Sequence, residues 1–356
     1  MKKIIYYTKY TRKGASSRMR SYQFFPFLKE NGFNVTVSPF LDSLYLEQLY
    51  SGKKINKTSV LKNYLRRFFS LFSIFKYDLI VIEKELFPYF PAIAEQILSF
   101  FKVKYMVDFD DALFHLYDQN PNKYIKFFLG SKIDSVMRNS TIVICGNSYL
   151  ADRAEKAGAK RVEIIPTVID LKRYKTKKNN LSENKKITIG WIGTPATLIF
   201  VKSIEVALFE VLNKYNVVFQ FIGGVSGILE NHPNIFYVKW TEKTEIKSIS
   251  NLDIGIMPIL DDKWAKGKCA YKLIQYMGCG LPVVGSFVGM NKEVIDENEN
   301  GFLATTDQEW INALTKLIEN EKLRTRFGIK GRGKVEKKYT LEVACNKLLS
   351  TINKII

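Results

Sequence analysis

The sequence predicts an α/β protein built from two doubly wound parallel sheets, and three observations support this. Short apolar stretches alternate with helical patterns along the chain. They fall into two sets, separated by a Lys/Asn-rich break at residues 175–186. The length of 356 residues is also enough for two domains of about 150 residues each.

Each expected strand is short and apolar, as in a parallel sheet that helices cover on both faces. The first set comprises Lys3–Tyr7, Asn34–Ser38, Asp78–Ile82, Tyr105–Phe109 and Thr141–Cys145. The second set comprises Ile187–Ile192, Val217–Ile222, Asp253–Pro258 and Leu281–Gly285. After the first strand we expect a helix over about Ser17–Asn31, ended by Gly32.

The composition narrows the class of partner. With 54 Lys and Arg against 35 Asp and Glu, the net charge is +19, which favours an anionic partner such as a phosphorylated substrate or a membrane surface. No RNA-binding or zinc motif supports nucleic acid. No apolar run reaches the roughly 18 residues of a membrane span, and the four scattered Cys fit reduced thiols in a cytoplasm.

A glycine loop follows the first expected strand and opens the first expected helix. Ligands of doubly wound sheets bind at this position, where Gly14 permits close approach and Arg18 and Arg20 can hold an anion. The sequence here is not G-x-G-x-x-G, so it does not indicate a dinucleotide site. An ordinary strand–helix turn remains the alternative.

Three carboxylates, Asp108, Asp110 and Asp111, end the strand in YMVDFDDALFHL. They either bind a divalent metal with a diphosphate or cap the next helix. His115 lies five residues beyond Asp110 and is either functional or a structural residue with satisfied hydrogen bonds.

The stretch KGKCAYKLIQYMGCGLPVVGS predicts a helix over about Lys268–Met277 followed by a buried strand. At 100° per residue, Lys268, Lys272 and Gln275 share one face of that helix, opposite an apolar face that packs. Cations beside a helix start and the flexible Gly267 favour a phosphate. The alternative is a solvated basic face.

The pattern K-x-x-x-K-L-I-Q-Y-M-x-x-G-L-P-V-V resembles the donor-site helix of family 4 of the retaining glycosyltransferases. The later stretch GSFVGMNKEVIDENENGFLA is similar to that family's G-x-N-x-E followed by N-G-F-L. The resemblance implies the GT-B fold, with two Rossmann-like domains facing across a cleft. It implies an acceptor-side domain over 1–168, a donor domain over 169–338, and a C-terminal helix over about 339–356 that packs back on the first.

The chain departs from the family pattern at four places. Gly267 and Gln275 stand where the family has acidic residues, and Thr194 and Thr197 occupy the region of its Arg and Lys after Gly193. The resemblance therefore implies that lysines supply the positive charge for the diphosphate. It places the donor against the following residues: Gly14, Arg18, Gly193, Thr194, Trp264, Lys266, Gln275, Gly289 and Asn291.

The resemblance implies an enzyme with Asp110, Lys268 and Lys272 as catalytic residues and with neither metal nor cofactor. It would move a sugar from a nucleotide-diphosphate sugar to a glycan or lipid-linked acceptor, with retention, in surface polysaccharide or lipopolysaccharide synthesis. Two alternatives remain. One is a GT-B nucleotide-sugar epimerase; the other is an inactive binding protein, which the loss of both acidic residues and the net charge suggest.

The stretch Leu61–Lys76 combines basic residues with many Phe and Leu. Such a helix either packs on the core or lies in a membrane interface, with Arg66 and Arg67 on the membrane and acceptor side. We therefore expect a cytoplasmic protein with an anionic membrane surface as a partner, peripheral on the inner face of the plasma membrane if the second interpretation holds.

Overall fold

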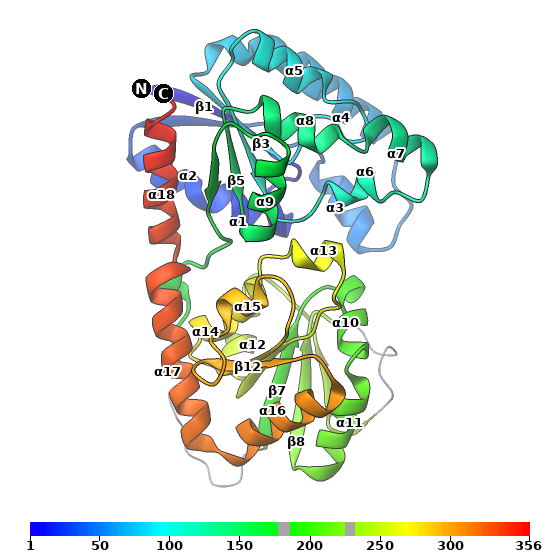
Figure 1. The fold of residues 1–356 in the computed structure, drawn as a ribbon, viewed down its shortest axis with the longest axis vertical. Helices are drawn as coiled ribbons and strands as arrows, with labels where there is room; N and C mark the ends of the chain where they lie inside the picture. Colours follow the sequence, from blue (N-terminus) through cyan, green and yellow to red (C-terminus); the bar gives the residue numbers. More distant parts are fainter. Residues whose placement is uncertain (177–185, 225–231) are drawn as a thin grey trace. The chain divides into compact units, whose positions relative to one another are not determined.

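The computed structural model describes residues 1–176, 186–224 and 232–356, so most of the predicted break at 175–186 lies outside the described residues. The chain divides into two compact units. The first contains residues 1–167, 267–269 and 344–356, and the second contains 168–266 and 270–343. Each unit is an α/β layer structure around its own sheet (Figure 1).

Within the described residues, the first unit has a six-stranded parallel sheet in the order β2-β1-β3-β4-β5-β6. Its strands are β1 (Lys2–Tyr7), β2 (Phe33–Val37), β3 (Leu79–Glu83), β4 (Tyr105–Phe109), β5 (Ile142–Cys145) and β6 (Val162–Ile164). The second unit's described sheet is also parallel and six-stranded, in the order β12-β11-β10-β7-β8-β9. Its strands are β7 (Ile187–Ile192), β8 (Val217–Ile222), β9 (Ile235–Val238), β10 (Ile254–Met257), β11 (Val283–Ser286) and β12 (Gly301–Ala304).

The two sheets confirm the predicted fold class, and the nine predicted strands are present with small shifts at their ends. The three unpredicted strands, β6, β9 and β12, are short and lie at sheet edges. Of these, β6 has the weakest apolar pattern, and an edge strand can form with such a pattern because it pairs on one side only.

The helices of the first unit are α1 (Ala15–Arg20), α2 (Phe25–Glu30), α3 (Ser43–Tyr50), α4 (Lys57–Ser70), α5 (Ile93–Phe100), α6 (His115–Asp118), α7 (Lys123–Leu129), α8 (Lys132–Asn139) and α9 (Ser148–Lys156). Helix α18 (Leu341–Asn353) ends in the same unit. The predicted single helix over Ser17–Asn31 is wrong, because the 3-10 turn η1 (Tyr22–Phe24) breaks it just before Pro26. A second 3-10 segment, η2 (Leu71–Lys76), continues α4.

The helices of the second unit are α10 (Ile199–Lys202), α11 (Glu205–Lys214), α12 (Glu245–Ser250), α13 (Lys263–Lys266), α14 (Tyr271–Gly278), α15 (Asn291–Val294), α16 (Asp307–Glu319) and α17 (Glu321–Lys338). Short 3-10 turns are η3 (Leu171–Arg173) and η4 (Pro195–Thr197). Helix α16 begins with a capping box formed by Thr306 and Glu309, which satisfies the first free N–H groups.

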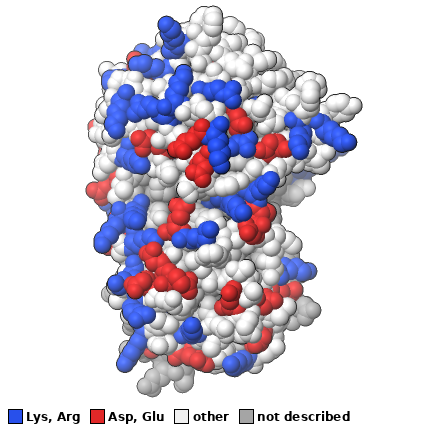
Figure 2. All heavy atoms as spheres, in the orientation of Figure 1, with Lys and Arg blue, Asp and Glu red and all other residues white. Residues whose placement is uncertain are grey.

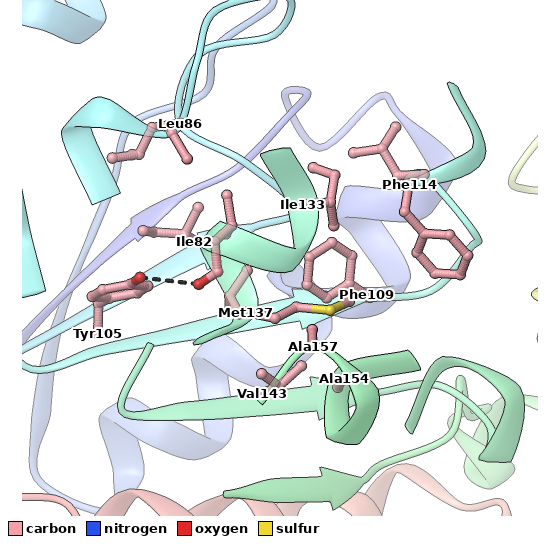
Figure 3. Packing of buried hydrophobic residues seen from close by; sticks show 14 of the residues in the cluster. Ile82, Leu86, Tyr105, Phe109, Phe114, Ile133, Met137, Val143, Ala154 and Ala157 are labelled. Atoms are coloured by element: carbon pink, nitrogen blue, oxygen red, sulfur yellow. Dashed lines mark hydrogen bonds between the residues drawn. The ribbon is translucent and has the colours of Figure 1, made fainter. Parts of the chain in front are cut away.

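The core of the first unit lies between one face of its sheet and the helices from η2 to α9. Alternate residues of β3, β4 and β5 point into it, and Ile133 and Met137 of α8 pack on them (Figure 3). The Tyr105 hydroxyl donates a 3.0 Å hydrogen bond to the carbonyl of Val136, so this buried polar group is satisfied. This packing fixes the carboxyl ends of the strands, where the polar residues gather.

Lys and Arg are spread over the visible face of the molecule (Figure 2). Among the described residues, none of the helices is both long enough and apolar enough to cross a bilayer.

Candidate functional site

Polar side chains gather at the carboxyl edge of the first sheet, where β1, β3 and β4 end next to one another. Ser16 and Ser17 begin α1 directly after the glycine loop. The Ser16 hydroxyl donates a 2.6 Å hydrogen bond to Asp110, and the Ser17 hydroxyl donates a 2.7 Å bond to Glu83. This edge is where doubly wound sheets bind their ligands.

Lys84 lies at the centre of this edge. It follows β3 with φ of 68°, a left-handed conformation that costs energy for a residue with a side chain. Its side chain is 3% exposed, with Nζ 2.9 Å from Oδ1 of Asp110 and 2.7 Å from Oδ2 of Asp111. The two ion pairs give a buried ammonium the partners that it needs.

The charges at this edge shift one another's pKa values. Burial opposes ionisation of Asp110, yet the adjacent Lys84 ammonium and the Ser16 hydroxyl lower its pKa to about 2. Burial raises the pKa of Glu83 to about 7, against the opposing effect of Lys84. Asp110 is therefore a fixed anion at neutral pH, whereas Glu83 titrates near neutrality.

Asp108 has a different partner from the other two carboxylates. Arg20 donates two hydrogen bonds to it, of 2.9 Å from Nε and 2.5 Å from Nη2. The same guanidinium donates a 2.7 Å bond to the carbonyl of Ile165. The bidentate pair ties α1 to β4 and engages Asp108 in the packing of the unit.

The segment 267–269 lies against this edge and belongs to the first unit. A Cβ on Gly267 would lie 2.6 Å from the backbone nitrogen of Ala112, so a side chain at this position does not fit without a shift. The carbonyl of Lys268 accepts a 3.0 Å hydrogen bond from Asn147, and the Cys269 thiol donates to the carbonyl of Asp110. Gly267 thus allows close contact with the backbone of Ala112, whereas the sequence had suggested close contact with a ligand.

The predicted helix start at Lys268 is wrong, because α14 begins at Tyr271 after Ala270, whose φ is 47°. The contacts of Lys268 and Cys269 within the first unit hold this stretch away from helical geometry. Lys268 therefore lies in a loop before the helix, and Lys272 lies in the first turn. Nζ of Lys272 lies 5.5 Å from the centre of the Trp191 ring, a cation–π distance.

The helical pattern predicted that Gln275 shares an exposed face with Lys272, and this prediction is wrong. Its side chain is 2% exposed, and Nε2 donates hydrogen bonds of 2.9 Å to Oε1 of Glu245 and 3.0 Å to the hydroxyl of Tyr174. Trp240 donates a 2.6 Å bond to the other oxygen of Glu245. A carboxylate from α12 thus lies beside the position where the resembled family has its second acidic residue.

The turn after β7 begins at Gly193. A Cβ there would lie 2.3 Å from the Trp191 ring, so the backbone passes close to that ring. Thr194 is exposed and caps the turn η4 together with Thr197, whose hydroxyl accepts a 3.2 Å hydrogen bond from the backbone N–H of Thr194. The predicted donor contacts of Gly193 and Thr194 remain predictions.

The turn after β11 brings Gly289 close to the end of α13. Gly289 has φ of 51°, and a Cβ there would lie 3.0 Å from Cα of Lys266. Nδ2 of the buried Asn291 donates a 3.1 Å bond to the carbonyl of Ser286, which fixes this turn. Lys266 forms an ion pair of 3.2 Å with Asp261. Trp264 is half-buried on α13.

In the first unit, a Cβ on Gly14 would lie 2.5 Å from Cβ of Tyr10, and Arg18 is a buried residue of α1.

The prediction that Arg67 lies on the membrane side is wrong, because its side chain is only 1% exposed. It donates hydrogen bonds of 3.0 and 2.9 Å to the carbonyls of Thr8 and Ser38. Arg67 is thus a core residue, whereas Arg66 is exposed on α4.

The predicted residues divide between the two units. The first contains Gly14, Arg18, Arg66, Arg67, Asp110 and Lys268, and the second contains Gly193, Thr194, Trp264, Lys266, Lys272, Gln275, Gly289 and Asn291. Sequence reasoning missed Glu83 and Lys84. A sequence signal for them exists, because the charged run Glu83–Glu85 directly follows the apolar run of β3. It also missed Glu245, for which no motif gives a signal.

His115 is held on both ring nitrogens, by Asp118 at 2.8 Å and by the Tyr149 hydroxyl at 2.8 Å. Its contacts are those of a structural histidine, the second of the two alternatives.

Comparisons with known proteins agree with the geometry. Residues 188–320, within the second unit, match the family described as glycosyl transferases group 1. No curated protein matches the chain. The whole chain is similar in structure to sucrose-phosphate synthase from Thermosynechococcus elongatus, with a TM-score of 0.72 and 13% identity over 100% of this chain and 99% of that one.

Two further solved structures share the fold. HepE from Anabaena in complex with UDP-glucose has a TM-score of 0.73 and 14% identity, over 99% of this chain and 100% of that one. A glycosyltransferase from Rickettsia africae has a TM-score of 0.70 and 14% identity, over 99% and 98% of the two chains. Residues 188–320 therefore form a glycosyl transferases group 1 domain, and the chain is a glycosyltransferase of the GT-B fold.

Proposed function

We propose that the protein transfers a sugar from a nucleotide-diphosphate sugar to a hydroxyl of a glycan or lipid-linked acceptor, with retention of configuration. One observation carries the proposal. From Lys263 to Ser286, around α14, the sequence contains four lysines and no carboxylate. A concentration of positive charge at a helix start suits a diphosphate. HepE, which has the same fold, is solved with UDP-glucose.

The proposal assigns a role to each group. Lys268, Lys272 and Arg18 stabilise the charge that develops on the leaving diphosphate, which is the largest electrostatic demand of such a reaction. Asp110 is ionised at neutral pH beside Lys84 and accepts a hydrogen bond from the acceptor hydroxyl. Positioning of the two substrates supplies the rest of the rate enhancement.

The donor contacts assigned to Trp264, Lys266, Gly289 and Asn291 belong to the same proposal. The packing of Gly289 against Lys266 supports a shared role, because it brings the turn after β11 against the end of α13 in the second unit. For Gln275 the proposal is narrower. Both of its donor hydrogens are engaged by Glu245 and Tyr174, so it would offer a donor hydroxyl only its carbonyl oxygen.

We further propose that transfer needs no divalent metal or other cofactor. Lys84 pairs with Asp110 and Asp111, and Arg20 pairs with Asp108, so each of the three carboxylates already has an internal cation as its partner. Transfer should keep its full rate in EDTA. Abolition by EDTA with rescue by manganese would revive a metal site at Asp108, Asp110 and Asp111.

We place the reaction in surface polysaccharide or lipopolysaccharide synthesis, on the cytoplasmic side of the plasma membrane. The net charge of +19 supports this setting, because the inner leaflet and lipid-linked glycan precursors are both anionic.

A thermal-shift screen of nucleotide sugars tests the donor, because a ligand of the folded state raises the melting temperature. The donor found is then incubated with and without candidate acceptors, and the anomeric configuration of the product is read by NMR. A glycoside that forms only with acceptor, with the donor's configuration, supports the proposal. A new epimer without acceptor indicates an epimerase, and tight donor binding without turnover indicates an inactive binding protein.

A further inference from the structure

A group of exposed aromatic side chains lies on the helices that cover one face of the first sheet. It consists of Phe68 and Phe69 of α4, Phe72 and Phe75 of η2, and Phe100 and Phe101 at the end of α5, which we call the aromatic surface. Phe72 is 72% and Phe100 is 81% exposed. Monomeric proteins seldom expose a contiguous apolar area without a partner for it.

Ring contacts arrange these side chains in two groups, and the segment η2, which carries Phe72 and Phe75, connects the groups. Phe68 lies 5.7 Å from Phe69 and 5.5 Å from Phe72, measured between ring centres. Phe75 lies 6.4 Å from Phe101, which connects η2 to α5. The inner sides of the same elements pack in the core through Ile74 and Leu98, so the exposed rings point away from the sheet.

The exposed charges within the segments that carry the aromatic surface have one sign. Residues 57–76 and 96–104 contain no Asp or Glu, and Glu95, the nearest carboxylate on α5, is buried and accepts a bond from the Leu86 N–H. The exposed cations of these segments are Lys57, Lys62, Arg66, Lys76, Lys102 and Lys104. In Figure 2 the top of the view is largely white, with blue atoms at its border.

Helix α7 repeats the combination. Tyr124, Phe127 and Phe128 are exposed there beside Lys123 and Lys126. Leu129 packs from the same helix into the same core cluster as Ile74 and Leu98, so α7 belongs to the same helix layer.

We propose that the aromatic surface docks on an anionic lipid bilayer, with its Phe rings in the interface and its cations against the lipid headgroups. Aromatic rings and long basic side chains are the combination that binds membrane interfaces. Each cation near an anionic leaflet adds to the attraction, and salt screens it over about 10 Å at 0.1 M. The absence of carboxylates from residues 57–76 and 96–104 favours an anionic bilayer over a protein partner, because a protein interface does not require charges of one sign.

The inference deepens the proposed function, because a lipid-linked acceptor would lie in the same bilayer. It differs from the sequence interpretation in its residues. Arg67 is buried and takes no part, whereas Phe100 and Phe101, which follow in a separate helix, complete the surface.

The test is sedimentation of the whole protein with vesicles of phosphatidylglycerol and phosphatidylcholine, without donor or acceptor. We expect binding at 0.1 M salt, at least about tenfold weaker partition into pure phosphatidylcholine, and release as salt rises. The variant Phe69→Ser/Phe72→Ser/Phe100→Ser should lose at least about tenfold in partition with an unchanged melting temperature, since exposed rings support little of the core. The matched control Phe236→Ser/Ile329→Ser, exposed in the second unit, should bind like wild type.

A second measurement locates the contact. The variant Phe72→Trp should show blue-shifted emission relative to wild type on vesicles and quenching by brominated lipids. Wild-type protein that stays in solution with anionic vesicles overturns the inference. A dimer that the triple Ser variant converts to monomers, without vesicle binding, assigns the surface to a second copy of this chain. If the protein does not bind vesicles, donor binding and transfer to a water-soluble acceptor can still occur. The membrane inference and the proposed function are therefore tested separately.

Discussion

Nζ of Lys84 lies 2.9 Å from Oδ1 of Asp110, at the point where β3 and β4 end side by side. Lys84 adopts a left-handed backbone conformation at this position. The strained backbone and the ion pairs are linked, because the turn directs the buried Lys84 ammonium toward two carboxylates that would otherwise repel each other. The lowered pKa of Asp110 keeps this carboxylate ionised within the unit at neutral pH.

Lys84→Met should destabilise the protein by about 3–5 kcal/mol at pH 7, because it leaves two poorly hydrated carboxylates without their cation. The loss should shrink as the pH falls, since Asp110 without its ammonium partner can then take up a proton. Urea unfolding at pH 7 and pH 5 measures both effects. The control is Lys13→Met, which breaks the exposed 2.8 Å pair with Glu47 and should cost at most about 1 kcal/mol. Equal losses in the two variants would contradict a special role for Lys84.

Glu83 should make stability depend on pH. Burial raises its pKa from 4.5 to about 7 in the folded protein, so the folded state holds this proton more tightly than the unfolded state. The resulting stabilisation is complete below pH 4.5 and is lost as the pH rises to about 7, at about 1.4 kcal/mol per unit. Glu83→Gln removes this dependence. The free energy of unfolding of the variant, relative to that of the wild type, should therefore increase between pH 5 and pH 8. If the free energies of the two proteins change in parallel with pH, the raised pKa of Glu83 is disproved.

Restoring the acidic residue of the resembled family should harm this protein. Gln275→Glu would place a second buried carboxylate within hydrogen-bond distance of Glu245, and like charges at that distance oppose ionisation. We expect a lower melting temperature at pH 7, partly recovered at low pH. Glu245→Gln/Gln275→Glu restores one amide and one carboxylate, so a double-mutant cycle should show a coupling of at least about 1 kcal/mol. Strict additivity would show that the two side chains act independently.

Lys272→Ala should lower kcat/KM at least about tenfold, which corresponds to about 1.4 kcal/mol of transition-state stabilisation. The reason is its place in the first turn of α14, where its ammonium would stabilise the charge that develops on the leaving diphosphate. Lys316→Ala is the matched control, because Lys316 also lies over an aromatic ring, at 5.4 Å from Phe302, but on α16. A variant with unchanged kcat/KM would remove Lys272 from the proposed reaction.

The positions of nine strands and their grouping into two parallel sheets follow from local sequence, because buried strands need continuous apolar runs with breaks between them. Edge strands such as β6 (Val162–Ile164) lack that run and were missed. The helical pattern at α14 (Tyr271–Gly278) predicted the buried face of Leu273, Ile274 and Met277. It did not predict its start, which the contacts of Lys268 and Cys269 decide.

The sequence by itself determined the fold class, the concentration of lysines before and within α14, and the resemblance to glycosyltransferases, since each is written in residues close together in the chain. Only the tertiary structure decided which charges meet. Lys84 reaches Asp110, Glu245 reaches Gln275, and Arg67 turns inward to the carbonyls of Thr8 and Ser38. The physical reason is that burial makes an unpaired charge or amide costly, so each takes the partner that the packed backbone brings within reach, however distant in sequence.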